Sequence, residues 1–145
     1  MIKSLKLQKH ILDHYEQISV GHWNEYTVLM FRDRPYYGIF IPNEELCIKL
    51  SDRYTFDPEF LLGLSNKTTY KATKKHSFDT GKITLTVFES EDGAIKAYYD
   101  TKYLNIFRGL KDVRYELSEE KSPMLYLYQT DRILGLICPV NYEEV

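Results

Sequence analysis

The chain has 145 residues, of which 43% are apolar and 28% are charged. These proportions are typical of a folded globular domain and exclude a disordered chain. The 19 basic and 21 acidic residues give a formal net charge of −2, which excludes a protein held to nucleic acid by overall positive charge.

The first half of the chain predicts one helix among short strands. Residues 2–7 alternate weakly between apolar and polar side chains, as a strand does, and residues 8–18 repeat apolar side chains at helical spacing. A meander of three antiparallel strands is expected to follow, joined by a turn at residues 32–35 and another at residues 42–45. These strands cover residues 27–31, 36–41 and 46–50.

The second half predicts a hairpin, a helix and three more strands. Residues 82–88 alternate strictly, and residues 94–99 form the return strand after a turn that ends at Gly93. Asp100 or Thr101 caps a helix that ends near Gly109. The three remaining strands are expected at residues 113–117, 124–128 and 133–138.

The resulting fold class is α+β, with two β-α-β-β-β units of antiparallel strands and one helix each. We place the units at about residues 1–70 and 80–145 of a single domain that covers residues 1–145. Residues 51–80 serve as the connector and carry an apolar patch at residues 60–64, which predicts a short helix or a docking loop.

Several motifs of the second half occur in the same order in a known family. Tyr99-Asp100 leads into Thr101-Lys102-Tyr103-Leu104, residues 113–117 read V-R-Y-E-L, and Ser122-Pro123 precedes a strand. The last strand ends in Leu136-Ile137-Cys138-Pro139-Val140-Asn141. From Gly93 to Val140 the chain resembles the C-terminal part of the bacterial DNA polymerase sliding clamp. This resemblance implies a DNA-clamp-like fold without catalytic residues.

The resemblance also implies two binding surfaces. In the clamp family the helices face the DNA phosphates, which points to the polar stripe of Lys102, Asn105 and Arg108 and, on the first helix, to Lys9. The family's terminal residues help to line a pocket for peptide motifs of polymerases and other partners. The residues that correspond to this pocket are Pro123, Leu136, Cys138, Pro139 and Val140.

The chain departs from the family, and simpler interpretations stay open. A clamp subunit carries three such domains, and Asn141 and Cys138 replace the family's terminal Arg and its Met before the proline. An ordinary solvated helix face is the alternative for the polar stripe. The lysine cluster of Lys71, Lys74 and Lys75 is expected in a solvated loop, with phosphate contact as the alternative.

No pattern indicates catalysis, a cofactor or a metal. Nucleophile-elbow and phosphate-loop motifs are absent from the sequence. His10 and His14 have the spacing of a zinc pair but lack a third ligand, so we expect surface or capping histidines. Cys47 and Cys138 are expected to be buried free thiols, with a disulfide or a metal pair as the alternative.

We therefore expect a non-enzymatic sliding-clamp-like protein of DNA replication or repair, located in the cytoplasm and without membrane contact. Its expected partners are duplex DNA, peptides of DNA polymerase or other clamp-binding proteins, and further copies of itself that close head to tail into a ring. A monomeric peptide-binding adaptor or decoy is the second hypothesis, and the net charge of −2 favours it. A small enzyme or ligand-binding domain on an unrelated α+β fold is the third.

Overall fold

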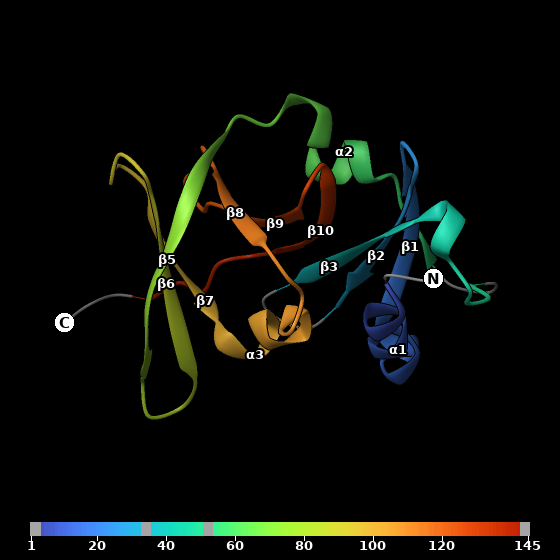
Figure 1. Ribbon diagram of the computed structural model, residues 1–145, viewed down its shortest axis with the longest axis horizontal. Coiled ribbons are helices and arrows are strands. Elements are labelled where there is room, and N and C mark those ends of the chain that lie inside the picture. The colour runs from blue at the N-terminus through green and yellow to red at the C-terminus, as the bar shows by residue number, and fades with distance from the viewer. Residues whose placement is uncertain (1–3, 33–35, 51–53, 143–145) are drawn as a thin grey trace. The chain divides into compact units, whose positions relative to one another are not determined.

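The computed structural model describes residues 4–32, 36–50 and 54–142. The chain is an α+β protein, as predicted, and divides into two compact units, Met1–Lys67 and Thr68–Val145. Strands dominate both units, and the helices are short (Figure 1). The clamp-like arrangement of a single domain stays a prediction.

Unit 1 is a helix followed by a small mixed sheet. In chain order its elements are α1 (Leu5–Asp13), η1 (Tyr15–Gln17), β1 (Ile18–Trp23), β2 (Tyr26–Phe31), β3 (Tyr37–Pro42), η2 (Asn43–Glu45), β4 (Tyr54–Thr55), α2 (Pro58–Leu62) and η3 (Leu64–Asn66). The strand order is β4-β1-β2-β3, and β1-β2-β3 is an antiparallel meander. The pair β1–β4 is parallel, so the prediction of purely antiparallel sheets is wrong at this edge.

Aromatic side chains attach α1 to the sheet of unit 1. Phe31 and Tyr37 face each other across the β2–β3 pair, and their rings stack with centroids 4.4 Å apart. The Nε2 atom of His10 lies 2.9 Å from the Tyr37 hydroxyl oxygen. Leu7 and Ile11, one helical turn apart, are fully buried on α1.

The start of the chain differs from the sequence-based expectation. Residues 5–7 form the first turn of α1 instead of a strand, and Ser4 accepts the first helical hydrogen bond, from the Gln8 N–H at 2.9 Å. The helix ends at Asp13, and Ile18 begins β1, a strand that the sequence analysis missed. The predicted turn at residues 32–35 lies, apart from Arg32, outside the described residues.

The predicted strand at residues 46–50 does not form, and the backbone at residues 45 and 47 bonds to a side chain of α1. The buried Gln8 side chain accepts the Cys47 N–H at 2.8 Å and donates to the Glu45 carbonyl at 2.7 Å. This arrangement leaves Cys47 exposed, so its predicted burial is wrong. The only strands described after Pro42 in unit 1 are the two residues of β4.

Unit 2 is an antiparallel sheet with one short helix. Its elements are β5 (Thr69–Asp79), β6 (Thr84–Ser90), β7 (Lys96–Asp100), α3 (Thr101–Leu104), η4 (Asn105–Phe107), β8 (Val113–Ser118), β9 (Leu125–Gln129) and β10 (Arg132–Ile137). The strand order is β10-β9-β8-β5-β6-β7. All the strands and the helix predicted for this half are confirmed to within two residues at their starts. The order β7-α3-β8-β9-β10 is the expected β-α-β-β-β unit, whereas no strand is described before α1 in unit 1.

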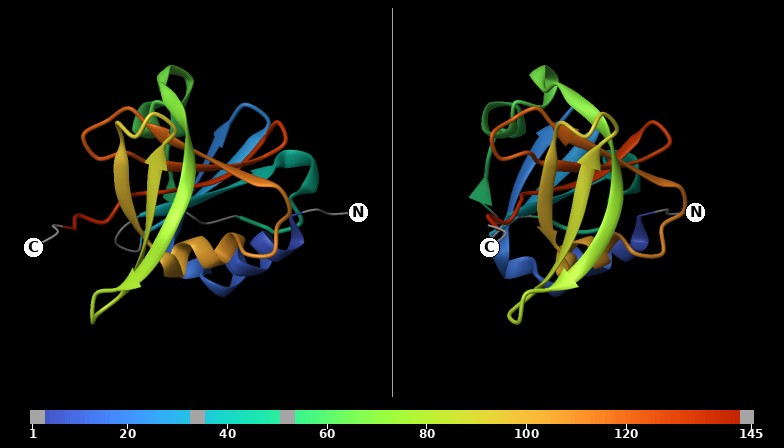
Figure 2. Two further views of the ribbon diagram at one scale, coloured as in Figure 1. Left: turned by 60° about the vertical axis from the view of Figure 1, so that its left-hand side comes forward. Right: turned by 90° about the vertical axis from the view of Figure 1, so that its left-hand side faces the viewer.

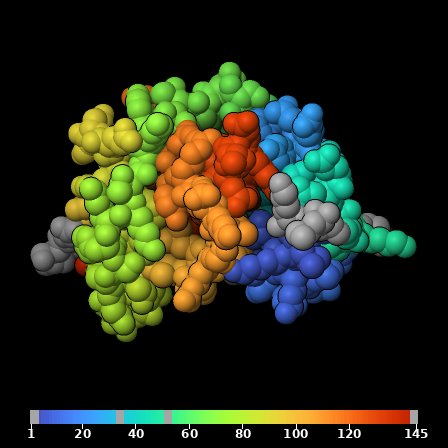
Figure 3. All heavy atoms as spheres, in the orientation of Figure 1, coloured from blue at the N-terminus to red at the C-terminus, as the bar shows by residue number. Residues whose placement is uncertain are grey.

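The expected connector at residues 51–80 holds a major strand. The 11-residue β5 pairs with both β6 and β8, and its hairpin with β6 projects past α3 at the turn (Figure 2). In Figure 3 the yellow-green atoms of β5 form a continuous exposed band. The polar sequence TYKATKKHSFD hid this strand because it lacks an apolar alternation. The apolar patch at residues 60–64 does include a short helix, α2.

Two buried tyrosines form part of the core of unit 2. Tyr99 and Tyr126 are almost completely buried, and the Tyr99 hydroxyl donates to the Pro123 carbonyl oxygen at 2.6 Å. Burial raises the pKa of both phenols well above the usual value. Cys138 is half-buried and forms no disulfide among the described residues, so its predicted full burial is also wrong. No helix among the described residues is long and apolar enough to cross a membrane.

Gly21 provides a test of the packing between β1 and the segment that enters α2. A Cβ atom at this position would lie 2.7 Å from both the Phe56 carbonyl oxygen and the Pro58 Cγ atom. Because the backbone must shift to relieve these contacts, we expect Gly21→Ala to lower the free energy of unfolding by about 1–3 kcal/mol. Urea titration measures the loss. The control is His22→Ala at the exposed neighbouring position, whose free energy of unfolding should stay within about 0.5 kcal/mol of that of the parent. Equal stability of Gly21→Ala, His22→Ala and the parent would contradict the proposed close packing at Gly21.

The buried phenols predict a loss of stability in alkali. The unfolded chain releases phenol protons near pH 10, whereas folded Tyr99 and Tyr126 keep theirs. Stability is therefore complete below about pH 10 and falls above it, by up to about 1.4 kcal/mol per pH unit for each tyrosine. Urea titrations at several pH values above and below 10 give this slope. Tyr126→Phe should reduce it, and an unchanged slope in that variant would count against the assignment.

Candidate functional site

The helical segment of unit 2, α3 followed by η4, has one buried face and one polar face. Asp100 starts α3 by accepting the Lys102 N–H at 3.0 Å, and Gly109 ends the segment with a φ of 87°, a conformation that glycine adopts without strain. Tyr103 and Phe107 are buried toward the core. The opposite side of the segment is therefore free to carry polar side chains.

A chain of hydroxyl groups holds α3 against the β5–β6 hairpin. Ser77 of β5 lies 2.8 Å from Thr86 of β6 through their Oγ atoms, and Thr86 lies 2.7 Å from the Thr101 Oγ1 atom of α3. Thr86, in the middle of the chain, is fully buried, whereas Ser77 at its β5 end is exposed. The position of α3 on the sheet is thus fixed by three side chains from three elements.

A hollow of about 360 Å³ lies beside this helix, and we call it the basic hollow. Lys74 of β5 and Arg108 after η4 are the charged residues that line it, and Asn105 adds an amide group. Leu104, Phe107, Leu110, Val113, Tyr115 and Leu127 supply apolar walls. Both charged residues that line the basic hollow are cations, and no described carboxylate is among its lining residues.

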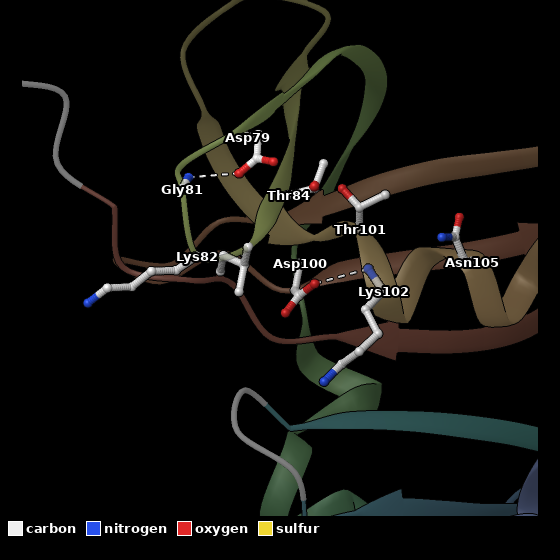
Figure 4. Close-up of a pocket in the computed structure, with 9 residues that line it drawn as sticks. Asp79, Gly81, Lys82, Thr84, Asp100, Thr101, Lys102 and Asn105 are labelled. Carbon is white, nitrogen blue, oxygen red and sulfur yellow. Dashed lines mark hydrogen bonds between the residues drawn. The ribbon is translucent and has the colours of Figure 1, made fainter.

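A second hollow, of about 480 Å³, lies at the start of α3, and we call it the mixed hollow (Figure 4). Its lining includes Asp79 and Asp100 as well as Lys82 and Lys102. Asp79 accepts the Gly81 N–H at 2.7 Å. In Figure 4 the Lys82 side chain extends away from the other labelled side chains. With two carboxylates for two ammonium groups, this hollow has little net charge.

The predicted DNA-facing residues are divided among three surfaces. Lys102, Asn105 and Arg108 are exposed; Lys102 lines the mixed hollow, Arg108 lines the basic hollow, and Asn105 lines both. Lys9 is exposed in unit 1, where it lines a groove between α1 and residues 47–49.

The predicted peptide-pocket residues differ in how far they reach the surface. Leu136 and Pro123 are buried, and the Pro123 carbonyl already accepts the Tyr99 hydroxyl. Cys138, Pro139 and Val140 are partly exposed. The Val140 N–H donates to the carbonyl of Tyr98 in β7 at 2.8 Å, which fixes the segment that follows β10 beside the β7 edge. A peptide could therefore touch only the last three of the five residues directly.

An aromatic cluster that the sequence analysis did not foresee lies beside this segment. The ring of Tyr142 lies 5.3 Å from that of Phe78 in β5 and 5.1 Å from that of Tyr98 in β7. The Lys96 ammonium group lies 5.8 Å from the Tyr98 ring centroid. The abundance of tyrosine was visible in the sequence, but the three rings meet only because β5 and β7 flank β6.

Lys74 is the residue of the basic hollow whose position the sequence analysis predicted wrongly. It was expected in a solvated loop. The structure puts it in β5, opposite buried Phe88 of β6, and therefore on the face of the hairpin that carries α3. The Thr and Tyr residues of its segment are a weak strand signal that could have indicated this position.

In the described part of the chain, no third His, Cys, Asp or Glu joins the histidine pair as a possible metal ligand. The His10 and His14 rings stack with centroids 4.1 Å apart, and His14 Nδ1 lies 3.0 Å from the His10 carbonyl oxygen. Within residues 4–32, 36–50 and 54–142, no three His, Cys, Asp or Glu side chains are grouped to hold a metal ion.

Comparison of the chain with protein-family models, curated proteins and solved structures gave no match.

Proposed function

We propose that the chain is a non-enzymatic sliding-clamp-like protein of DNA replication or repair that contacts the phosphates of duplex DNA through the basic hollow. The observation that carries the proposal is the convergence of Lys74 and Arg108 from separate elements beside Asn105. Ammonium, guanidinium and amide groups are the donors that proteins use most against DNA phosphates. Such contacts bind the DNA backbone and do not depend on the base sequence, as a protein that slides along DNA requires.

The order of elements in unit 2 also supports the proposal. The elements β7-α3-β8-β9-β10 follow the β-α-β-β-β order of the clamp resemblance, and the helix of that unit carries the polar stripe. In unit 1, α1 likewise precedes three antiparallel strands.

The proposed contact is weak for a single copy. Two cations neutralise about two phosphates, which corresponds to a slope of about −1.8 in a plot of log affinity against log salt. The net charge of −2 adds no general attraction to DNA. Weak, non-specific contacts suit a protein that encloses DNA with several copies, because enclosure prevents dissociation without a strong hold on the backbone.

Reversing the charge of the basic hollow tests the DNA contact. Lys74→Glu with Arg108→Glu should weaken binding to a labelled 30-base-pair duplex at least about tenfold and flatten the salt slope by about 1.8. Fluorescence anisotropy over a salt series measures both quantities. Lys111→Glu with Lys121→Glu makes the same change of charge at exposed positions outside the hollow and should have a much smaller effect. Equal losses in the two double variants, or no binding by the parent, would overturn the proposed contact.

The second candidate function is a monomeric peptide-binding adaptor or decoy that engages replication proteins. The partly exposed segment Cys138, Pro139 and Val140, fixed beside the aromatic cluster of Phe78, Tyr98 and Tyr142, is the observation that favours it. Apolar and aromatic surface of this kind suits a short peptide with apolar side chains.

Val140→Asp tests the adaptor hypothesis. A carboxylate on the partly exposed side chain should weaken binding of a bacterial polymerase's clamp-binding peptide at least about tenfold, while the backbone bond to Tyr98 remains possible. Asn141→Asp adds the same charge at the exposed next position and should bind like the parent. Isothermal titration gives the affinities, and equal binding by all three proteins would remove the proposed site.

A further inference from the structure

Unit 1 exposes two large apolar side chains on its shortest α-helix. Phe60 is 89% exposed and Leu61 is 60% exposed, side by side on α2. Single exposed apolar residues are common, whereas an adjacent aromatic and aliphatic pair on one turn presents a continuous apolar surface that a partner could cover. We call residues 57–63 the apolar knuckle.

Hydrogen bonds hold the apolar knuckle in one conformation. The Glu59 carboxylate accepts the Trp23 Nε1–H at 3.1 Å, and it accepts the Ser65 hydroxyl at 2.8 Å and the Ser65 backbone N–H at 3.0 Å. Asp57 caps the helix by accepting the N–H groups of Glu59 and Phe60. Glu59 thus links the knuckle to β1 on one side and to η3 on the other.

The ends of the apolar knuckle are fixed as well. Pro58 is buried against Gly21 of β1, and Gly63 ends α2 with a φ of 59°. Phe60 and Leu61 are therefore presented to solvent by a preorganised turn. A partner that binds them does not have to order the segment first, which lowers the entropic cost of association.

A matching concave surface exists in the same unit. The α1 groove is a hollow of about 330 Å³ with a mostly apolar lining. Its lining residues are Leu5, Gln8, Lys9, Leu12, Cys47, Ile48 and Lys49. Leu5 is 61% exposed and Leu12 is 54% exposed, so the apolar side chains of the groove are open to a partner. The volume is at the low end for ligand pockets, which suits one or two inserted side chains.

The charges of the two surfaces are complementary. The charged residues that line the α1 groove are Lys9 and Lys49. The charged residues of the apolar knuckle itself are Asp57 and Glu59, with Lys67 close to its Gly63 end. An apolar centre with opposite charges on the two rims is the usual composition of a specific protein contact.

We propose that the apolar knuckle of one copy inserts Phe60 and Leu61 into the α1 groove of a second copy. The contact joins two different surfaces, so it is heterologous: in a pair, one copy still has an open groove and the other an open knuckle, and further copies can add at both ends. Both surfaces belong to unit 1, and the proposal does not rest on DNA binding by unit 2. The contact is smaller than a standard interface, so association should be reversible and appear at high protein concentration.

Light scattering over a concentration series tests the self-association. The parent mass should rise with concentration, whereas Phe60→Asp and Leu12→Asp should each stay monomeric. Both positions are exposed, so the variants should keep the fold, which circular dichroism checks. A parent that is monomeric at every concentration, or an association that survives either variant, would overturn the proposal and leave these surfaces to other partners.

Mixing the two variants distinguishes this contact from any other. Phe60→Asp keeps an intact α1 groove and Leu12→Asp keeps an intact apolar knuckle, so an equimolar mixture should form a 1:1 dimer that cannot grow. A mixture that remains monomeric would contradict the heterologous pairing. The double variant Lys9→Glu with Lys49→Glu should also associate more weakly than the parent. The ratio of the two association constants should approach one as the salt concentration rises. Loss of DNA binding in the basic-hollow variant would change none of these results.

Discussion

The α-helices of this protein are too short to be stable by themselves, and side-chain hydrogen bonds compensate. Isolated helices need about 12–15 residues to be marginally stable in water, whereas α1 has nine, α2 has five and α3 has four. Each is therefore bound to its surroundings by polar side chains. Gln8 bonds to Glu45 at the end of η2 and to Cys47 after it. Glu59 bonds to Trp23 of β1, and Thr101 continues the hydroxyl chain from the β5–β6 hairpin.

These bonds determine which surfaces the protein presents. The bonds of Gln8 to residues 45 and 47 create the α1 groove, because they hold an apolar segment beside the helix instead of in the sheet. The bonds of Glu59 and the Asp57 cap hold α2, on which Phe60 is exposed. The bond between Thr86 and Thr101 places the start of α3 on the hairpin face that carries Lys74, so that Arg108 and Lys74 line one hollow.

The two proposed contacts are weak individually and gain strength together. Under the two proposals, a pair of cations on one copy would give a small affinity for duplex DNA, and one apolar knuckle would give a small affinity between copies. When several copies are joined, their DNA contacts act at a high effective concentration, and the combined affinity rises without any new residue. The two proposed activities rest on different residues, so mutation should separate them, and the proposals together predict that they reinforce each other in the parent.

The sequence by itself determined the elements whose signals are local. Strict alternation in residues 82–88 and Gly93 after them indicated the β6–β7 hairpin, and Asp100 and Gly109 marked the ends of the α3–η4 segment, because these patterns reflect burial and backbone conformation at neighbouring residues. Only the tertiary structure decided the features that depend on contacts between residues far apart in the sequence. It made a strand of polar β5, held residues 45 and 47 against Gln8 of α1, and brought Lys74 and Arg108 to one hollow. These outcomes depend on pairing and bonding partners far along the chain, which the local pattern of each segment does not identify.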